Sequence, residues 1–343
     1  MMLSVIALGV MISGTPAAPA APKVPLALAP AMTPPVATFS IVARDPENGD
    51  LGIAVESKFF AVGAVVPWAR AGVGAIATQA FANTMFGPRG LALLEQGLGA
   101  QAVLDSLLAS DPGRDRRQVG IVDAEGQSVS HTGGECQPWA GHRNGPGYAV
   151  QGNILAGEAV TQAMERAFLD SRGPLAGRLL TALEAGQAAG GDSRGQQSAA
   201  LVVVRTGGGY GGMNDRYCDL RVDDHPRPIE ELRRLYGLWL PNALVLEGYR
   251  LLDSGQIDEA IARGEEAIAA DPKSAEGYYH TACYLARAGR GDAAVARLAE
   301  AIARDGSIAQ RATTDPDFDS VRKLPRYREL TGGGSGSPGA TGK

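Results

Sequence analysis

The order of strand-like and helix-like segments between residues 38 and 224 most constrains the fold. Residues 38–57 read TFSIVAR, a DPENGD turn and LGIAVES, the pattern of a tight hairpin. Two short strands, a stretch of helical periodicity, a second hairpin, two helices and two strands follow. This order lacks the strict strand–helix alternation of a parallel sheet. It predicts an α+β fold in which two sheets lie between layers of helices.

The sequence changes character after Pro228 and becomes helical, with an internal repeat. Gly255 and Gly289 are 34 positions apart, as are Asp258 and Asp292. This period is typical of tetratricopeptide repeats, which are helix–turn–helix units. Residues 231–331 therefore resemble a small all-α array of about two repeats with a closing helix. The array would recruit a peptide or protein partner, pack on the preceding domain, or form a homodimer interface.

The first 37 residues are predicted to lie outside the folded domains. Residues 1–20 contain an apolar run too short to span a bilayer, followed by Ala18-Pro19-Ala20, which fits a cleavage site. We expect a signal peptide and an exported protein, periplasmic or secreted, without a stable membrane span. Residues 21–37 are rich in proline and alanine and predict a spacer outside the core. Residues 332–343 predict a flexible tail.

Charge and cysteine content exclude several classes of function. A formal net charge of -5 gives no electrostatic reason to expect a nucleic-acid partner. The three cysteines lie far apart and form no disulfide framework or paired zinc motif. His131, Cys136 and His142 are close in sequence, but their spacing matches no standard zinc pattern. We therefore expect no metal and no cofactor.

Thr38, the first residue of the first strand, is the principal candidate for chemistry. A threonine at the start of a mature chain acts as a nucleophile, with its own α-amino group as the base. That amine has a pKa of about 8, so a useful fraction is neutral without help from a histidine. Two interpretations are open, because threonine also favours strands for structural reasons. The catalytic one requires cleavage of the Ala37–Thr38 bond, for which autoproteolysis is one route.

Other polar residues are placed near Thr38 by the predicted hairpin or by glycine-rich turns. Glu56 and Lys58 end the second strand, where they would hold the threonine or form a surface ion pair. Arg70 is a further cation, facing either this place or solvent. Asn153 precedes a helix, where it would donate to an oxyanion or cap the helix. The candidates for substrate contact are Thr78, Gln79, Asn83, His142, Gln151 and Arg194.

These segments together resemble a bacterial family filed as domain of unknown function 1028, which has an N-terminal-nucleophile (Ntn) hydrolase-like fold. The resemblance covers residues 38 to about 230. It rests on TFSIVARDP, GIAVESK, AVGAVVPWA, GVGAIATQAFAN, RQVGIVD, TGGECQPWAGH, QGNILAG, GGDSRGQQSAAL and GGYGGMNDRYCDLRVDDH. It implies a four-layer αββα sandwich over residues 38–230 and a candidate terminal threonine, but no established substrate.

A more distant likeness is to the proteasome β subunit. TFSIVARD, GIAVESKFFAVG and VGAIATQAFANTMFGPRGLALL follow the same order of nucleophile strand, acidic-ended second strand and glycine-rich strand leading into a helix. The resemblance implies Thr38 as nucleophile and Glu56 in the place of that family's aspartate. Arg70 or Lys58 would substitute for its lysine, although a guanidinium cannot relay a proton at neutral pH.

Two functions remain open from the sequence. The first is an exported Ntn-type amidohydrolase that cleaves a small-molecule or peptide amide, with Asn153 or a backbone N–H at the oxyanion. The second is a non-catalytic scaffold that binds a ligand or a protein through the helical repeats. Activity that survives a Thr38→Ala substitution would favour the second.

Overall fold

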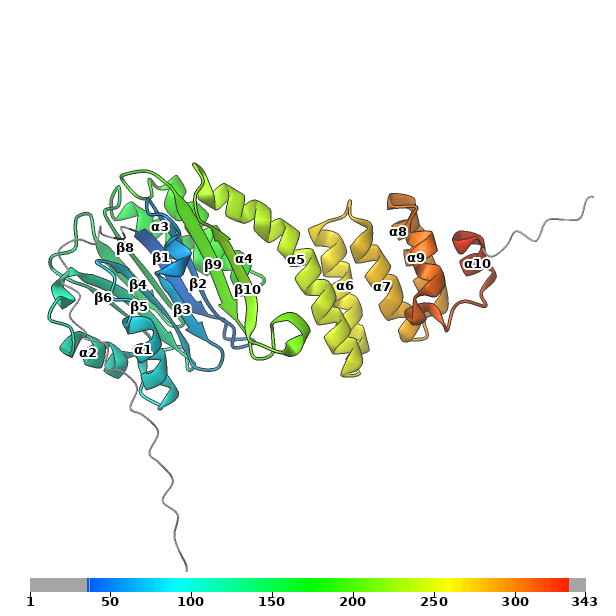
Figure 1. Ribbon diagram of the computed structural model, residues 1–343, viewed down its shortest axis with the longest axis horizontal. Coiled ribbons are helices and arrows are strands. Elements are labelled where there is room, and N and C mark those ends of the chain that lie inside the picture. Colours follow the sequence, from blue (N-terminus) through cyan, green and yellow to red (C-terminus); the bar gives the residue numbers. More distant parts are fainter. Residues whose placement is uncertain (1–35, 37, 333–343) are drawn as a thin grey trace, which may run out of the picture. The chain divides into compact units, whose positions relative to one another are not determined.

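The computed structural model describes Val36 and residues 38–332 (Figure 1). The expected signal peptide, the spacer apart from Val36, and the tail beyond residue 332 lie outside the described residues. Within the described part, no helix is both long and apolar enough to cross a membrane.

Two antiparallel sheets form the first part of the described chain. The larger sheet contains, in spatial order, β10 (Arg216–Val222), β9 (Ser198–Val204), β2 (Leu51–Ser57), β1 (Thr38–Arg44), β8 (Tyr148–Asn153) and β7 (Gly141–Gly145). The smaller sheet contains β3 (Pro67–Arg70), β4 (Gly74–Ala80), β5 (Arg117–Asp123) and β6 (Ser128–Thr132). The prediction of a mixed fold with two sheets that are not parallel is confirmed.

The register of the β1–β2 hairpin decides which side chains share a face. Arg44 pairs with Leu51 across the turn, and Thr38 therefore pairs with Ser57 at the open end. Because successive side chains of a strand point to opposite faces, Phe39 and its alternates pack on the helices. Val42 lies on the other face, in the core between the sheets.

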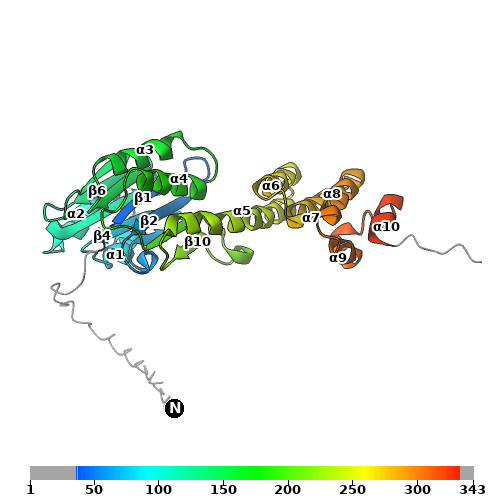
Figure 2. The same ribbon diagram turned by 90° about the horizontal axis from the view of Figure 1, so that it is seen from above.

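Helices cover the outer faces of the sheets. The larger sheet packs against α3 (Ala159–Asp170) and α4 (Leu175–Ala188), and the smaller against α1 (Phe86–Glu95) and α2 (Ala100–Ala109). Figure 2 shows α3 and α4 together over one side of the strands and α1 on the other side. Short 3₁₀ turns, η2 (Val62–Ala64), η3 (Arg114–Arg116) and η4 (Tyr210–Gly212), lie in the connections.

The C-terminal region is helical, as predicted. Its elements are α5 (Pro228–Asp253), α6 (Ile257–Ala270), α7 (Ala275–Arg287), α8 (Gly291–Arg304), α9 (Ile308–Thr314), η5 (Pro316–Phe318) and α10 (Pro325–Thr331). Gly255 and Gly289 follow α5 and α7 with φ of 81° and 72°, a backbone conformation that favours glycine. The 34-residue spacing therefore marks two equivalent turns between consecutive helices.

Val36 corrects the expectation that the spacer contributes nothing to the core. Its side chain is 5% exposed and packs between the sheets. Its backbone N–H donates to Ala80 O at 2.7 Å, and the Ala80 N–H donates back to Val36 O at 3.0 Å. The chain just before β1 is thus held on the edge of β4, because an apolar side chain and a pair of backbone hydrogen bonds both find partners there.

Candidate functional site

Thr38 is buried where β1 begins, between its register partners Ser57 of β2 and Asn153 of β8. Its hydroxyl donates to Val36 O at 2.7 Å, so it contacts the segment that precedes it. A second, longer contact of 3.4 Å joins the Thr38 and Ser57 hydroxyls. Thr38 therefore faces the space between the sheets, and its hydroxyl is held by the carbonyl of Val36.

Buried glutamines from both sheets surround this space. The Gln79 amide N–H group donates to Thr38 O at 3.3 Å and to Gln118 Oε1 at 2.8 Å. The Asn153 amide donates to the same Gln118 oxygen at 2.9 Å, which uses one of its two N–H bonds. Gln118 thus joins two candidate residues that the sequence predicted separately.

Gln151 extends the network along β1. Its amide donates to Ser40 Oγ at 2.6 Å, and Ser40 donates to Gln79 Oε1 at 2.6 Å. Gly120 of β5 leaves the necessary space, because a Cβ atom there would lie 2.1 Å from Gln151 Oε1. A close approach of this kind requires glycine.

The network reaches the surface at His142. The Gln118 amide donates to Thr132 Oγ1 at 2.9 Å, and Thr132 Oγ1 lies 2.9 Å from His142 Nδ1. Burial of the ring, with a smaller effect from His131, lowers the pKa of His142. A neutral imidazole is therefore favoured at the outer end of a chain of hydrogen bonds that begins at Thr38.

Glu56 lies on the opposite face of the sheet from Thr38. It pairs with Phe39, and residues that alternate with it, such as Ala54, pack against the helices. Glu56 is fully buried, and neither carboxylate oxygen has a hydrogen-bond partner among the described residues. The implied role of Glu56 beside the Thr38 hydroxyl is not supported, because one step along a strand reverses the side-chain direction.

Burial raises the pKa of Glu56 well above its usual range, and the negative charge of Asp192 raises it further. The backbone N–H of Gln197 and the charges of Arg194 and Lys58 act in the other direction but do not compensate. The Gln197 N–H itself donates to Ser57 O at 3.1 Å. Glu56 therefore favours its protonated form in the folded chain.

Arg194 and Lys58 belong to the surroundings of Glu56. Arg194 forms a two-pronged ion pair with Asp192, with Nε to Oδ1 at 3.1 Å and Nη2 to Oδ2 at 2.7 Å. Asp192 also accepts the Lys58 backbone N–H at 3.2 Å, and Lys58 Nζ donates to Gln196 O at 3.1 Å. These contacts connect the loop before β9 to the end of β2.

Arg70 does not join the site. It pairs with Gly74 at the end of β4 opposite to Gln79, and its guanidinium forms an ion pair with Glu95. β3 and β4 are antiparallel, so the end of β3 lies beside the start of β4. Arg70 is therefore excluded as a substitute for the proteasome lysine.

Thr78 and Asn83 contribute to the turn that leads into α1. The Thr78 hydroxyl donates to Asn83 O at 3.3 Å, and Asn83 Oδ1 accepts the Met85 N–H at 3.1 Å. The Asn83 amide also donates to Asp111 Oδ2 at 2.9 Å. Both side chains therefore hold the turn together, whereas the Gln79 amide donates to Thr38 O.

Ser57, Ser40 and Gln118 are site residues that the sequence prediction missed. For Ser57, the length of the turn from Asp45 to Asp50 was sufficient to predict which residue of the second strand lies opposite Thr38. A hairpin that closes with Arg44 opposite Leu51 places Thr38 opposite Ser57 and not Glu56. Gln118 had no comparable signal, because its contact with Thr38's neighbours depends on how the two sheets stack.

One group of possible metal ligands occurs within Val36 and residues 38–332, away from Thr38. The ligand atoms of Cys283, Asp315 and Asp317 lie within 4.8 Å of one another. Tyr279 donates to Asp315, and Tyr249 donates to Asp317 at 3.2 Å. These hydrogen bonds connect α7 and α5 to η5 and account for the cluster structurally.

Comparison with known proteins places the sheets and their helices in one family. Residues 38–232 match the family described as a family of unknown function, DUF1028. A crystal structure of a DUF1028 protein from Silicibacter pomeroyi is 33% identical and aligns with a TM-score of 0.53. The alignment covers 58% of this chain and 88% of the other. No curated protein matches the sequence. The chain belongs to the DUF1028 family of unknown function.

Proposed function

We propose that residues 38–232 form an Ntn-type amidohydrolase whose nucleophile is Thr38, released when the Ala37–Thr38 bond is cut. The observation that carries the proposal is the position of the Thr38 hydroxyl. It lies at the start of the central strand, in a buried polar site, and donates to the carbonyl of Val36 at 2.7 Å. The hydroxyl is thus engaged with the segment whose removal would make it an N-terminal nucleophile.

Maturation would follow the chemistry of an N-to-O acyl shift. The Thr38 Oγ attacks the Ala37 carbonyl carbon, the C–N bond breaks, and the acyl group moves to Oγ as an ester while the nitrogen takes the proton. One water molecule then hydrolyses the ester, which leaves Ala37 as a carboxylate and Thr38 with a free α-amine. Loss of Val36 from its place against Ala80 uncovers the threonine.

The mature site would cleave an amide of a small molecule or peptide. The α-amine of Thr38 accepts the hydroxyl proton as Oγ attacks the carbonyl, and it returns the proton to the leaving amine. Water then hydrolyses the acyl ester. Asn153 retains one N–H beyond the one that Gln118 accepts, and it would donate to the oxyanion. Ser57, opposite Thr38, orients the nucleophile.

The finer features of the fold are part of the proposal. Helices on the outer faces of two stacked sheets are consistent with a four-layer αββα Ntn-type sandwich. Paired helices that repeat every 34 residues are consistent with a tetratricopeptide-like module in residues 231–331. Export of the protein by the predicted signal peptide would bring this enzyme to amides outside the cytoplasm.

The test compares wild type with Thr38→Ala, Thr38→Ser and Ser57→Ala on a panel of peptide and acyl amides, measuring release of primary amine. We expect activity in wild type and Thr38→Ser, a loss of at least about 10³-fold in Thr38→Ala, and a smaller loss in Ser57→Ala. Thr161→Ala is the matched control, because Thr161 is also fully buried but bonds only to Glu158 O, at 3.0 Å. Equal rates for wild type and Thr38→Ala would contradict the proposal.

A non-catalytic scaffold is the second candidate, and two observations favour it. Thr38 is fully buried, and the carboxylate expected to assist it lies on the other face of the sheet. A chain that keeps Val36 in the core would leave Thr38 buried and inaccessible to a substrate. It would bind partners through its helices, as a monomer or a homodimer. Such a protein would give no amine release in any variant.

A further inference from the structure

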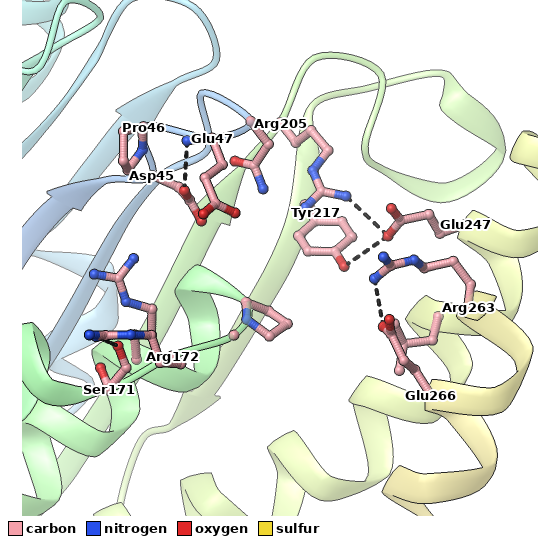
Figure 3. Close-up of a pocket in the computed structure, with 15 residues that line it drawn as sticks. Asp45, Pro46, Glu47, Ser171, Arg172, Arg205, Tyr217, Glu247, Arg263 and Glu266 are labelled. Carbon is pink, nitrogen blue, oxygen red and sulfur yellow. Dashed lines mark hydrogen bonds and ion pairs between the residues drawn. The ribbon is translucent and has the colours of Figure 1, made fainter. Parts of the chain in front are cut away.

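A separate cavity of about 720 Å³ lies away from Thr38, where the helical region meets the sheets and their helices. Its walls come from the β1–β2 turn, the loop between α3 and α4, the β9–β10 pair, and helices α5 and α6. In Figure 3, Asp45 and Glu47 lie above Arg172, and Arg205, Tyr217 and Glu247 line the other side. The size is that of a small-molecule pocket.

On one side of the cavity the charged groups form ion pairs with one another. Arg205 donates to both oxygens of Asp50 at 2.7 and 2.6 Å, pairs with Glu247 at 3.2 Å, and lies 3.9 Å from the centre of the Tyr217 ring. Arg263 pairs with Glu266, which lies one turn further along α6, at 2.6 Å. Arg205 faces two carboxylates, so this wall carries one excess negative charge, although each of these charged groups already has an ion-pair partner.

The α3–α4 side carries two arginines without an acidic partner among the described residues. Arg178 stacks 4.4 Å from the centre of the Phe168 ring, and its buried Nε has no hydrogen-bond partner. Arg172 donates from its Nη1 to the carbonyl oxygens of Leu169 and Ser171, each at 2.9 Å, and these hydrogen bonds orient its guanidinium. A guanidinium held in this way is suited to a carboxylate, which it binds in a planar, two-pronged geometry.

The β1–β2 turn supplies the opposite charge. Asp45 is 5% exposed, and its Oδ1 accepts the Glu47 N–H at 3.0 Å, which fixes the carboxylate. Neither Asp45 nor Glu47 forms an ion pair with any described residue, although both line the same cavity as Arg172 and Arg178. Two positive and two negative groups therefore share one cavity without contacting each other.

We propose that this cavity binds a small zwitterion, a free amino acid or a short peptide. Its carboxylate would lie against Arg178 and Arg172, and its ammonium group against Asp45 and Glu47. A simple anion would neutralise only the two arginines, and it would leave the carboxylates of Asp45 and Glu47 without a positive partner in the same cavity. This proposed binding site does not involve Thr38. It gives α5 and α6 a role, because these helices supply part of the cavity wall on the side of Arg205.

The test uses isothermal titration calorimetry on the full chain carrying Thr38→Ala, so that the result does not depend on cleavage or turnover. The probes are L-alanine, L-alanyl-L-alanine, N-acetyl-L-alanine and L-alaninamide. We expect at least one of the two zwitterions to bind, with at least tenfold weaker binding of the two singly charged probes. The ratio between L-alanine and L-alanyl-L-alanine distinguishes a free amino acid from a peptide.

Variants locate the binding. Arg178→Gln and Glu47→Gln should each weaken the zwitterion at least tenfold, and Glu47 is exposed, so its replacement leaves the fold intact. Arg116→Gln is the matched control, because Arg116 also stacks on a ring, that of Phe81 at 3.7 Å, outside the cavity. No binding of either zwitterion at about 10 mM would overturn the proposal. So would equal affinity for N-acetyl-L-alanine, or unchanged affinity in both variants.

Discussion

Glu56 and Ser57 are neighbours at the end of β2, and both are fully buried, yet they lie in opposite environments. Ser57 faces the space between the sheets, where Thr38 and a set of amide side chains satisfy one another. Glu56 faces the helices, and neither of its carboxylate oxygens has a partner among the described residues. At this end of β2, a polar residue on one face of the sheet is therefore part of a hydrogen-bond network, whereas the ionisable residue on the other face is buried without a hydrogen-bond partner among the described residues.

The sharpest way to break the network is Gln118→Ala. Its Oε1 accepts from Gln79 and Asn153. The loss of this oxygen leaves the Asn153 amide without that acceptor and leaves Gln79 only its longer contacts, to Thr38 O at 3.3 Å and Gln151 O at 3.4 Å. At 1–3 kcal/mol for a buried group left unsatisfied, with a smaller loss at Gln79, we expect a loss of about 3 kcal/mol in the free energy of unfolding. Urea denaturation measures this, with Gln101→Ala as control, because Gln101 is exposed and bonds only to Asp105. Losses of equal size in the two variants would contradict the network.

Gly120→Ala tests the same face by steric means. The new Cβ would lie 2.1 Å from Gln151 Oε1 and would force Gln151 away from Ser40. We expect a loss of about 2 kcal/mol, measured by urea denaturation. Gly134→Ala is the control, because a Cβ atom added at Gly134 would have no atom within 4 Å outside the neighbouring residues of the chain. A neutral Gly120→Ala would mean that Gln151 does not pack as described.

Glu56→Gln tests the other face through its pH dependence. The folded pKa of Glu56 is raised above the unfolded value near 4.5, so the folded chain holds a proton that the unfolded chain releases. The contribution of Glu56 to the free energy of unfolding is therefore complete at pH values below its pKa in the unfolded chain. It is lost as the pH rises through its pKa in the folded chain.

We therefore expect wild type to lose more stability than Glu56→Gln between pH 5 and pH 8, measured by urea denaturation at both. Glu329→Gln should behave as wild type, because the Glu329 side chain on α10 is 63% exposed. Parallel pH profiles of stability for wild type and Glu56→Gln would contradict the raised pKa of Glu56. They would mean that a hydrogen-bond donor stabilises its carboxylate in the folded chain.

Arg70→Ala is expected to have the smallest effect. Arg70 and its partner Glu95 are 45% and 55% exposed, and such pairs contribute less than about 1 kcal/mol. Arg117→Ala is the contrast, because Arg117 and Asp111 are 13% and 6% exposed, and the loss of a buried partner costs about 3 kcal/mol. Amide hydrolysis, if present in wild type, should survive Arg70→Ala. Loss of activity there would return Arg70 to the site.

The sequence predicted the elements of the fold better than the site. Period-two patterns and turn residues located β1 and β2, and the spacing of Gly255 and Gly289 located the helix pairs, because both are local signals. Glu56 was misplaced by one residue of register, a difference that reverses the face of the sheet. Gln118 and the role of Val36 depend on contacts between distant segments, which no local pattern reports.

Intact-mass measurement of the purified protein tests the central proposal most directly, with Thr38→Ala produced in the same way. If the Thr38 hydroxyl cleaves the Ala37–Thr38 bond, the wild-type chain begins at Thr38, and the Thr38→Ala chain retains Val36 and Ala37. A wild-type mass that still includes Val36 and Ala37 would contradict the proposal and leave Thr38 as a buried strand residue.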